Sequence, residues 1–197
     1  MNKVALIDLE TTGLDPVLHE IIEIGAVVFD PATLEVIDTV SVRVKPERLH
    51  DAEPKALAVN GYNARDWKSA SDLAWGLSVL AGATHGATFM SYNVTFDWSF
   101  IRESVKRSRE VGLAFQKQKI DLLSIAWSRI PHSSMKNWSL RAVCAYLGIE
   151  PEKDPHRAVD GAEKAFEVYR ALMKRRPLEE VAHLVGQRLR VIEKETQ

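Results

Sequence analysis

Three stretches near the N-terminus have the hydrophobic patterns of β-strands. Residues 3–7 and 21–29 are almost continuously apolar, which is typical of strands buried on both faces. In residues 34–44, valines alternate with polar neighbours, and this period of two is typical of a strand with one solvated face. Residues 30–33, Asp-Pro-Ala-Thr, form a turn signal. The short connections predict an antiparallel meander.

The remainder of the chain has mainly a helical period. Apolar residues three and four positions apart predict helices over residues 70–81, 96–108, 121–129, 139–147, 157–174 and 177–195. Ser69 or Ser71 is expected to cap the first helix and Ser139 the fourth, which Gly148 ends. Short apolar segments at 87–91 and 119–120 predict two further strands. This order predicts an α/β fold in which helices cover both faces of a mixed sheet.

Length and composition are those of one globular domain. The chain has 197 residues, and its 46% hydrophobic and 27% charged content argues against collagen, coiled-coil and disordered chains. No apolar run approaches the roughly 20 residues that a membrane span requires, so no membrane association is expected. The N-terminus enters an apolar strand without a cleavage signature, so no signal peptide is expected and the predicted location is cytoplasmic.

The cysteine count excludes some kinds of site, whereas the net charge does not decide whether the partner is a nucleic acid. Cys144 is the single cysteine, which excludes an internal disulfide and argues against a cysteine-based zinc site. The formal net charge of -1 neither indicates nor excludes a nucleic-acid partner, because acidic residues that hold cations lower the count. Evidence for such a partner must therefore come from local motifs.

Two carboxylates end the first strand. Asp8 and Glu10 are two residues apart, so a strand presents them on the same face. They repel each other, and a hard divalent cation would relieve both this repulsion and the cost of burying them. The alternative is a pair of solvated acids where the strand ends, and these two residues alone do not decide between the interpretations.

The residues that follow these acids resemble a known motif. Residues 11–14, Thr-Thr-Gly-Leu, supply two hydroxyls, a flexible turn and an apolar side chain. Residues 8–14, Asp-Leu-Glu-Thr-Thr-Gly-Leu, with residues 21–26, Ile-Ile-Glu-Ile-Gly-Ala, resemble the first motif of the DEDD 3′→5′ exonuclease superfamily. The resemblance is closest to its DEDDh branch, which includes the bacterial proofreading exonuclease of DNA polymerase III and RNA-trimming exonucleases.

A second motif supports this resemblance. Residues 93–97, Asn-Val-Thr-Phe-Asp, are similar to the family's Asn-x-x-Phe-Asp, with Tyr92 where the family often has histidine. By itself, Asp97 could simply stabilise the first turn of a helix, where the macrodipole favours an anion. With the first motif present, Asp97 is expected to be the third acid of the site.

The third motif departs from the family pattern. Residues 155–162, Pro-His-Arg-Ala-Val-Asp-Gly-Ala, resemble the family's His-x-Ala-x-x-Asp segment. The family aspartate lies five residues after the histidine, where this chain has Gly161, whereas Asp160 lies four residues after His156. Asp160 is expected to be the remaining ligand, since residues four apart share a helix face. The alternatives are a weakened site or another acid nearby in sequence, Asp154 or Glu163.

The resemblance covers residues 3–175 and implies a ribonuclease H-like fold with a mixed five-stranded sheet. It implies hydrolysis with two Mg²⁺ or Mn²⁺ ions, which stabilise the attacking and leaving oxygens together. Four acids would hold the ions: Asp8, Glu10, Asp97 and Asp160. His156 would take the proton of the attacking water, because a pKa near neutrality suits a general base.

The resemblance also implies a site for the terminal nucleotide. It would be formed by residues of the first two motifs, Thr11, Thr12, Gly13, Leu14, Asn93 and Phe96. Leu14 would lie against a base, and Phe96 would stack on the substrate or only pack in the core. Basic residues at 102–109 are either a solvated face or a track for the strand. Histidines outside the motif, among them His19, are interpreted as surface residues, and Glu23 as a hydrogen-bonded structural acid.

The expected protein is a metal-dependent 3′→5′ exonuclease. It would act on single-stranded or frayed 3′ ends of DNA or RNA and release nucleoside 5′-monophosphates. Residues 1–175 would form this domain, and residues 176–197 a helix that packs on it or docks a partner, either a polymerase or a second copy of the chain. The alternative function is a nucleic-acid-binding module of the same fold with weakened or lost activity, because Gly161 occupies the expected ligand position.

Overall fold

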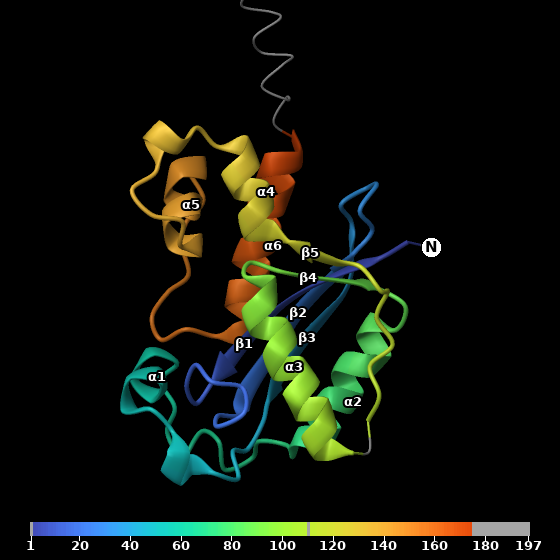
Figure 1. The fold of residues 1–197 in the computed structure, drawn as a ribbon, viewed down its shortest axis with the longest axis vertical. Coiled ribbons are helices and arrows are strands. Elements are labelled where there is room, and N and C mark those ends of the chain that lie inside the picture. Colours follow the sequence, from blue (N-terminus) through green and yellow to red (C-terminus); the bar gives the residue numbers. More distant parts are fainter. Residues whose placement is uncertain (1, 110, 175–197) are drawn as a thin grey trace, which may run out of the picture.

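A mixed sheet of five strands, in the order β3-β2-β1-β4-β5, forms the centre of the protein (Figure 1). The computed structural model describes residues 2–109 and 111–174. The strands are β1 (Val4–Thr11), β2 (Ile21–Phe29), β3 (Val36–Arg43), β4 (Thr88–Ser91) and β5 (Lys119–Asp121). β1, β2 and β3 pair antiparallel, as the meander predicts, and β4 and β5 continue the sheet in parallel on the other side of β1. The predicted mixed five-stranded sheet is therefore confirmed.

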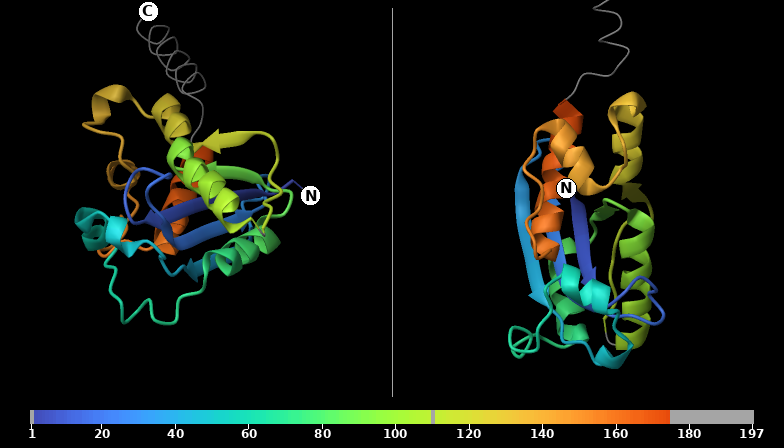
Figure 2. Two further views of the ribbon diagram at one scale, coloured as in Figure 1. Left: turned by 60° about the horizontal axis from the view of Figure 1, so that its bottom comes forward. Right: turned by 90° about the vertical axis from the view of Figure 1, so that its left-hand side faces the viewer.

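Helices cover both faces of this sheet (Figure 2). The described residues form α1 (Pro54–Val59), α2 (Leu73–Thr84), α3 (Val94–Ser108), α4 (Leu122–Arg129), α5 (Leu140–Leu147) and α6 (Ala158–Lys174). Short 3₁₀ turns lie at Leu49–Asp51 and His132–Ser134. One hydrophobic core joins the sheet to α4, α5 and α6, and a second core joins the opposite face to α2 and α3.

The apolar run of β1 is continuous because both of its faces are buried. Val4 and Leu6 contribute to the core under α6, whereas Ala5 and Ile7 contribute to the core under α2 and α3. Side chains alternate along a strand, so Asp8 continues the row that faces α6. The first carboxylate therefore lies where this buried row ends.

Helix α6 begins very close to the sheet because β2 has a glycine at the contact. A Cβ on Gly25 would collide with the backbone of Ala158 at the start of α6. The buried Glu23 carboxylate fixes the same junction, since it accepts hydrogen bonds from Arg43, from Arg157 and from the Ala158 N–H at 3.1–3.2 Å. The interpretation of Glu23 as a hydrogen-bonded structural acid is confirmed.

The start of α2 differs from the prediction. The helix begins at Leu73, and the side chain of Asp72 caps it by accepting the Trp75 N–H at 2.7 Å. The expectation that Ser69 or Ser71 caps this helix is therefore wrong. An aspartate and a serine both satisfy a free N–H at a helix start, so the hydrophobic pattern alone did not place the boundary.

Helix α5 is bounded as predicted, whereas α1 was not predicted. The Ser139 hydroxyl accepts the Ala142 N–H, and Gly148 ends α5 with a φ of 73°. No residue of α1 is buried, so no apolar period marks this helix in the sequence. The helix predicted for residues 177–195 lies outside the described residues. Among the residues that are described, no helix has both the length and the apolar character needed to cross a membrane.

We expect Gly25→Ala to lower the free energy of unfolding by about 3 kcal/mol, because the added methyl group forces α6 away from the sheet. Urea denaturation followed by circular dichroism measures the change. Gly82→Ala in α2 is the matched control, since a Cβ there meets no atom within 4 Å, and it should be neutral or slightly stabilising. Equal stability of the Gly25→Ala variant and the wild type would contradict the close contact.

Candidate active site

A cavity of about 420 Å³ opens at the carboxyl end of β1. Its walls come from the end of β1 and the following loop, from α1, from the start of α3, and from the segment between α5 and α6. Pockets of this size that contain a few converging polar groups are typical of binding and active sites. Segments far apart in the sequence therefore meet at one place.

Three of the four predicted acids line this cavity: Asp8, Glu10 and Asp97. Asp8 and Glu10 extend from the same face of β1. Asp97 lies in the first turn of α3 and is only 4% exposed. The macrodipole of α3 favours a negative charge at this position. The strand and the helix thus bring together carboxylates that the sequence separates.

Burial and mutual repulsion raise the pKa of these carboxyl groups. The pKa of Asp8 lies well above its usual value, first because the group is buried and then because Asp97 and Glu10 repel it. Burial followed by repulsion from Glu152 raises the pKa of Glu10 to about 8, and burial raises the pKa of Asp97 to about 7. Such groups retain protons unless a cation neutralises them, and an all-oxygen ligand set fits Mg²⁺ or Mn²⁺.

The fourth predicted acid, Asp160, is not among the residues that line the cavity. Asp160 is exposed on α6, whereas Gly161 is buried, and a Cβ at position 161 would collide with Asp8 Oδ2. One residue along a helix turns the side chain by about 100°. The expectation for Asp160 assumed that His156 shares its helix face, but α6 begins only at Ala158.

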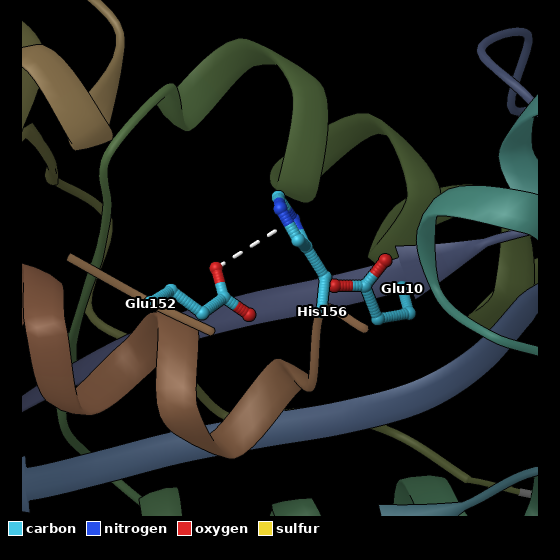
Figure 3. Close-up of side chains that lie close together, drawn as sticks. All are labelled: Glu10, Glu152 and His156. Atoms are coloured by element: carbon cyan, nitrogen blue, oxygen red, sulfur yellow. Dashed lines mark ion pairs between the residues drawn. The ribbon is translucent and has the colours of Figure 1, made fainter. Parts of the chain in front are cut away.

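A different acid, Glu152, lines the cavity from the segment that leads into α6. Its side chain is 12% exposed, and its Oε1 accepts the backbone N–H of Arg157 at 2.8 Å. Ligand atoms of Glu10, Glu152 and His156 lie within 4.8 Å of one another (Figure 3). The sequence did not indicate Glu152 as a site residue. The one feature that could have done so is its position, four residues before His156.

His156 lies at the edge of the cavity between two carboxylates. Its Nδ1 is 3.6 Å from Glu152 Oε2, and its Nε2 is 3.5 Å from Asp154 Oδ1. The side chain is 34% exposed, and its backbone N–H donates to the Val59 carbonyl at 3.1 Å. An imidazole in this position can exchange a proton with a molecule in the cavity and with solvent.

Five of the six residues predicted to hold a nucleotide line the cavity: Thr11, Gly13, Leu14, Asn93 and Phe96. The sixth, Thr12, is fully buried, and its hydroxyl accepts the Glu20 N–H at 2.9 Å, so it shapes the loop instead. Leu14 is 72% exposed and free to contact a ligand. The centroid of the Phe96 ring lies 4.9 Å from that of the Phe100 ring, and Phe96 also lines the cavity, so it packs against the core and faces the cavity at once.

Helix α1 contributes three residues to the cavity wall that the sequence did not indicate: Lys55, Ala56 and Val59. Lys55 adds a positive charge to a wall that is otherwise rich in carboxylates. The neighbouring Asn60, which also lines the cavity, donates to the Thr11 carbonyl at 3.1 Å and so joins α1 to the end of β1. These residues were missed because α1 has no buried face.

The loop of residues 12–20 is held by two side chains whose roles the sequence did not reveal. Arg107 belongs to the basic run, yet it donates at 2.6–2.7 Å to loop carbonyls, those of Pro16, Val17 and His19. The expectation that His19 lies at the surface is wrong, because its side chain is buried and its Nε2 lies 3.2 Å from Glu53. The loop that carries Leu14 is therefore anchored to α3.

Comparison with known proteins identifies a matching family and similar sequences. The sequence model of a family described as exonuclease matches residues 5–169. A PolC-type DNA polymerase III from Thermotoga petrophila is 30% identical over 164 residues, which is 83% of this chain and 11% of that protein. Protein NEN2 from Arabidopsis thaliana is 27% identical over 172 residues, 85% of this chain and 34% of that protein. The chain thus spans a small part of these curated relatives.

Solved structures confirm the fold. The nuclease domain of 3′hExo, described as a DEDDh family member bound to rAMP, has a TM-score of 0.69 at 20% identity, covering 88% of this chain and 92% of that chain. Exonuclease I has a TM-score of 0.77 at 18% identity, covering 90% of this chain and 42% of that chain. The ribonuclease H-like arrangement of the sheet and helices is common to all three.

We expect Arg107→Ala to lower the free energy of unfolding by about 2 kcal/mol, because three hydrogen bonds from a charged donor hold the loop. Urea denaturation measures the loss, and limited proteolysis should cut the variant within residues 12–20. Arg102→Ala, which removes an exposed arginine of the same helix, should stay within about 0.5 kcal/mol of the wild type. An equal loss of unfolding free energy in both variants would contradict the role of Arg107 in holding this loop.

Proposed function

This chain belongs to the exonuclease family, and we propose that it shortens nucleic acids from the 3′ end. The substrate would be single-stranded or frayed DNA or RNA, and hydrolysis of each terminal phosphodiester would release a nucleoside 5′-monophosphate. One observation carries the proposal: three carboxylates, those of Asp8, Glu10 and Asp97, face one cavity with His156 at its edge.

The carboxylates fit two Mg²⁺ or Mn²⁺ ions. All of these groups are hard oxygen ligands. Cations would offset the burial and repulsion that raise the pKa of Asp8 and Glu10, and the burial that raises the pKa of Asp97. Asp8 would be one of their ligands, and its carboxylate occupies the space that a side chain at Gly161 would need. When bound, such ions neutralise the phosphodiester and stabilise the attacking and leaving oxygens.

His156 is the proposed general base. A neutral imidazole nitrogen would accept a proton from water as the water oxygen attacks phosphorus. The carboxylates of Glu152 and Asp154, at 3.6 and 3.5 Å, would stabilise the imidazolium that forms. Because the side chain is 34% exposed, the proton can then pass to solvent.

The nucleotide would lie between the loop after β1 and the start of α3. Leu14 would pack against a base, Asn93 would contact the sugar and phosphate, and Lys55 would attract the phosphate. The rAMP bound to the 3′hExo domain is a nucleoside monophosphate, which supports the proposed product. The relatives of PolC type are polymerases, which supports a polymerase as a partner.

Gly161 favours a second candidate function, a nucleic-acid-binding module with weakened or lost activity. The third motif has no acid at this position, and Asp160 beside it is exposed. A chain of this kind would bind single strands without cutting them. The two candidates therefore differ in one measurable property, cleavage in the presence of Mn²⁺.

With Mn²⁺, the wild type should shorten a 5′-labelled single-stranded oligonucleotide stepwise and should release the label of a 3′-labelled one as a mononucleotide. Asp8→Asn should lower this rate by at least about 1,000-fold, because the loss of a metal ligand removes several kcal/mol of transition-state stabilisation. Denaturing gels measure both effects.

Glu163→Gln is the control for this experiment, because it changes an exposed acid of α6 outside the cavity and should cleave like the wild type. A wild type that binds the oligonucleotide without cutting it would favour the binding module. An Asp8→Asn variant that cuts at the full rate would exclude the proposed site.

Leu14→Ala should raise KM for an oligonucleotide about tenfold with little change in kcat, because a leucine packed on a base contributes about 1.5 kcal/mol to binding. Steady-state kinetics measure both constants. Leu18→Ala removes an exposed leucine of the same loop that does not line the cavity, so its KM should match the wild type. Equal KM values for the two variants would contradict the role of Leu14.

A further inference from the structure

The carboxylate of Asp8 occupies the space that a side chain at position 161 would need. The helix approaches the sheet at Gly25 and Gly161, and a side chain on Gly161 would collide with the Asp8 carboxylate. Asp160 is exposed on the same helix. An acid that completes the site therefore has to come from another segment.

Glu152 occupies a suitable position. Its side chain is 12% exposed and lines the cavity, and a carboxylate oxygen lies within 4.8 Å of ligand atoms of Glu10 and His156 (Figure 3). Two oxygens on opposite sides of a Mg²⁺ ion are about 4.2 Å apart, so small side-chain movements would bring Glu10 and Glu152 onto one ion.

Local contacts hold the Glu152 carboxylate toward the cavity. Its Oε1 accepts the Arg157 N–H at 2.8 Å. The guanidinium of Arg157 is itself fixed, because it donates to Glu23 at 3.2 Å and to the Asn60 carbonyl at 2.9 Å. Carboxylate oxygens have about four lone-pair sites, so this hydrogen bond leaves acceptor capacity for a cation. The Glu152 carboxylate is thus preorganised in the cavity wall.

Other acids near the third motif lack this combination of burial and position. Asp160 and Glu163 are exposed, the side chain of Asp154 is 78% exposed, and none of the three lines the cavity. Glu152 instead is only 12% exposed and lies beside Glu10, where two carboxylates repel each other. Burial of like charges is costly unless a cation or a proton offsets it.

Building on the proposed two-cation exonuclease, we propose that Glu152 is the fourth metal-ligating acid of this site. With Glu10, it holds the cation nearest His156 and supplies the carboxylate that Gly161 lacks. The glycine at 161 then reflects a relocated ligand. The site is complete, and weakened activity does not follow from the third motif.

The test is Mn²⁺ binding, measured by isothermal titration calorimetry with adenosine 5′-monophosphate present. The wild type is expected to bind two ions. Glu152→Gln keeps the shape of the side chain and removes its charge. The affinity of this variant for one of the two ions should be at least tenfold lower than that of the wild type. Asp160→Asn tests the rival ligand, and it should bind both ions as the wild type does.

Thermal unfolding separates a ligand from a merely structural residue. Without metal, Glu152→Gln should be at least as stable as the wild type, because a buried repulsive charge has been removed. With saturating Mn²⁺, its Tm should rise less than that of the wild type. Glu152→Asp retains the charge, so Mn²⁺ should raise its Tm by more than it raises that of Glu152→Gln. This variant also allows the test to be made if Glu152→Gln fails to fold.

The outcomes distinguish this proposal from the proposed function. Equal affinity of the wild type and Glu152→Gln for two ions would overturn the role of Glu152 and leave the exonuclease proposal intact. If only the Asp160→Asn variant loses one of the two ions, the role of Glu152 is again overturned and the exonuclease proposal stays intact. Asp160 would then be the fourth metal-ligating acid. A wild type that binds no Mn²⁺ and leaves an oligonucleotide uncut would overturn the exonuclease proposal itself.

Discussion

Repulsion between the carboxylates gathered at the end of β1 is the constraint on which the site depends. Asp8, Glu10 and Asp97 face one cavity, and the pKa of each is raised by burial. A fold that holds these groups together loses stability by doing so, unless cations or protons neutralise them. This cost agrees with the proposal that divalent cations bind at this cavity.

The packing around β1 holds these carboxylates close together although they repel one another. Apolar side chains bury both faces of the strand, and the row that faces α6 ends at Asp8. Glycine at positions 25 and 161 lets α6 approach closely, while Glu23 binds Arg157 and the N–H of Ala158. The same Arg157 backbone holds Glu152. One junction thus fixes both the helix and the segment that carries His156.

The sheet and the longer helices could be predicted because their apolar periods reflect burial directly, and the resemblance to an exonuclease family is confirmed. Helix α1 escaped prediction because none of its residues is buried. The three acids of the first two motifs were singled out by the resemblance, and all three line the cavity because β1 and α3 are regular elements that end there. Glu152 was missed because it lies between α5 and α6, where no period relates residue number to side-chain direction. The expectation for Asp160 used the four-residue spacing of a helix to relate it to His156. His156 precedes the start of α6, so this spacing does not apply.

Anomalous diffraction from a crystal soaked in Mn²⁺ with a nucleoside 5′-monophosphate tests the central claim most directly. Two manganese peaks in the cavity, about 3.5–4 Å apart and contacted by the carboxylates of Asp8, Glu10 and Asp97, are the predicted result. A cavity without manganese under saturating conditions, with these carboxylates turned away from one another, would contradict the account.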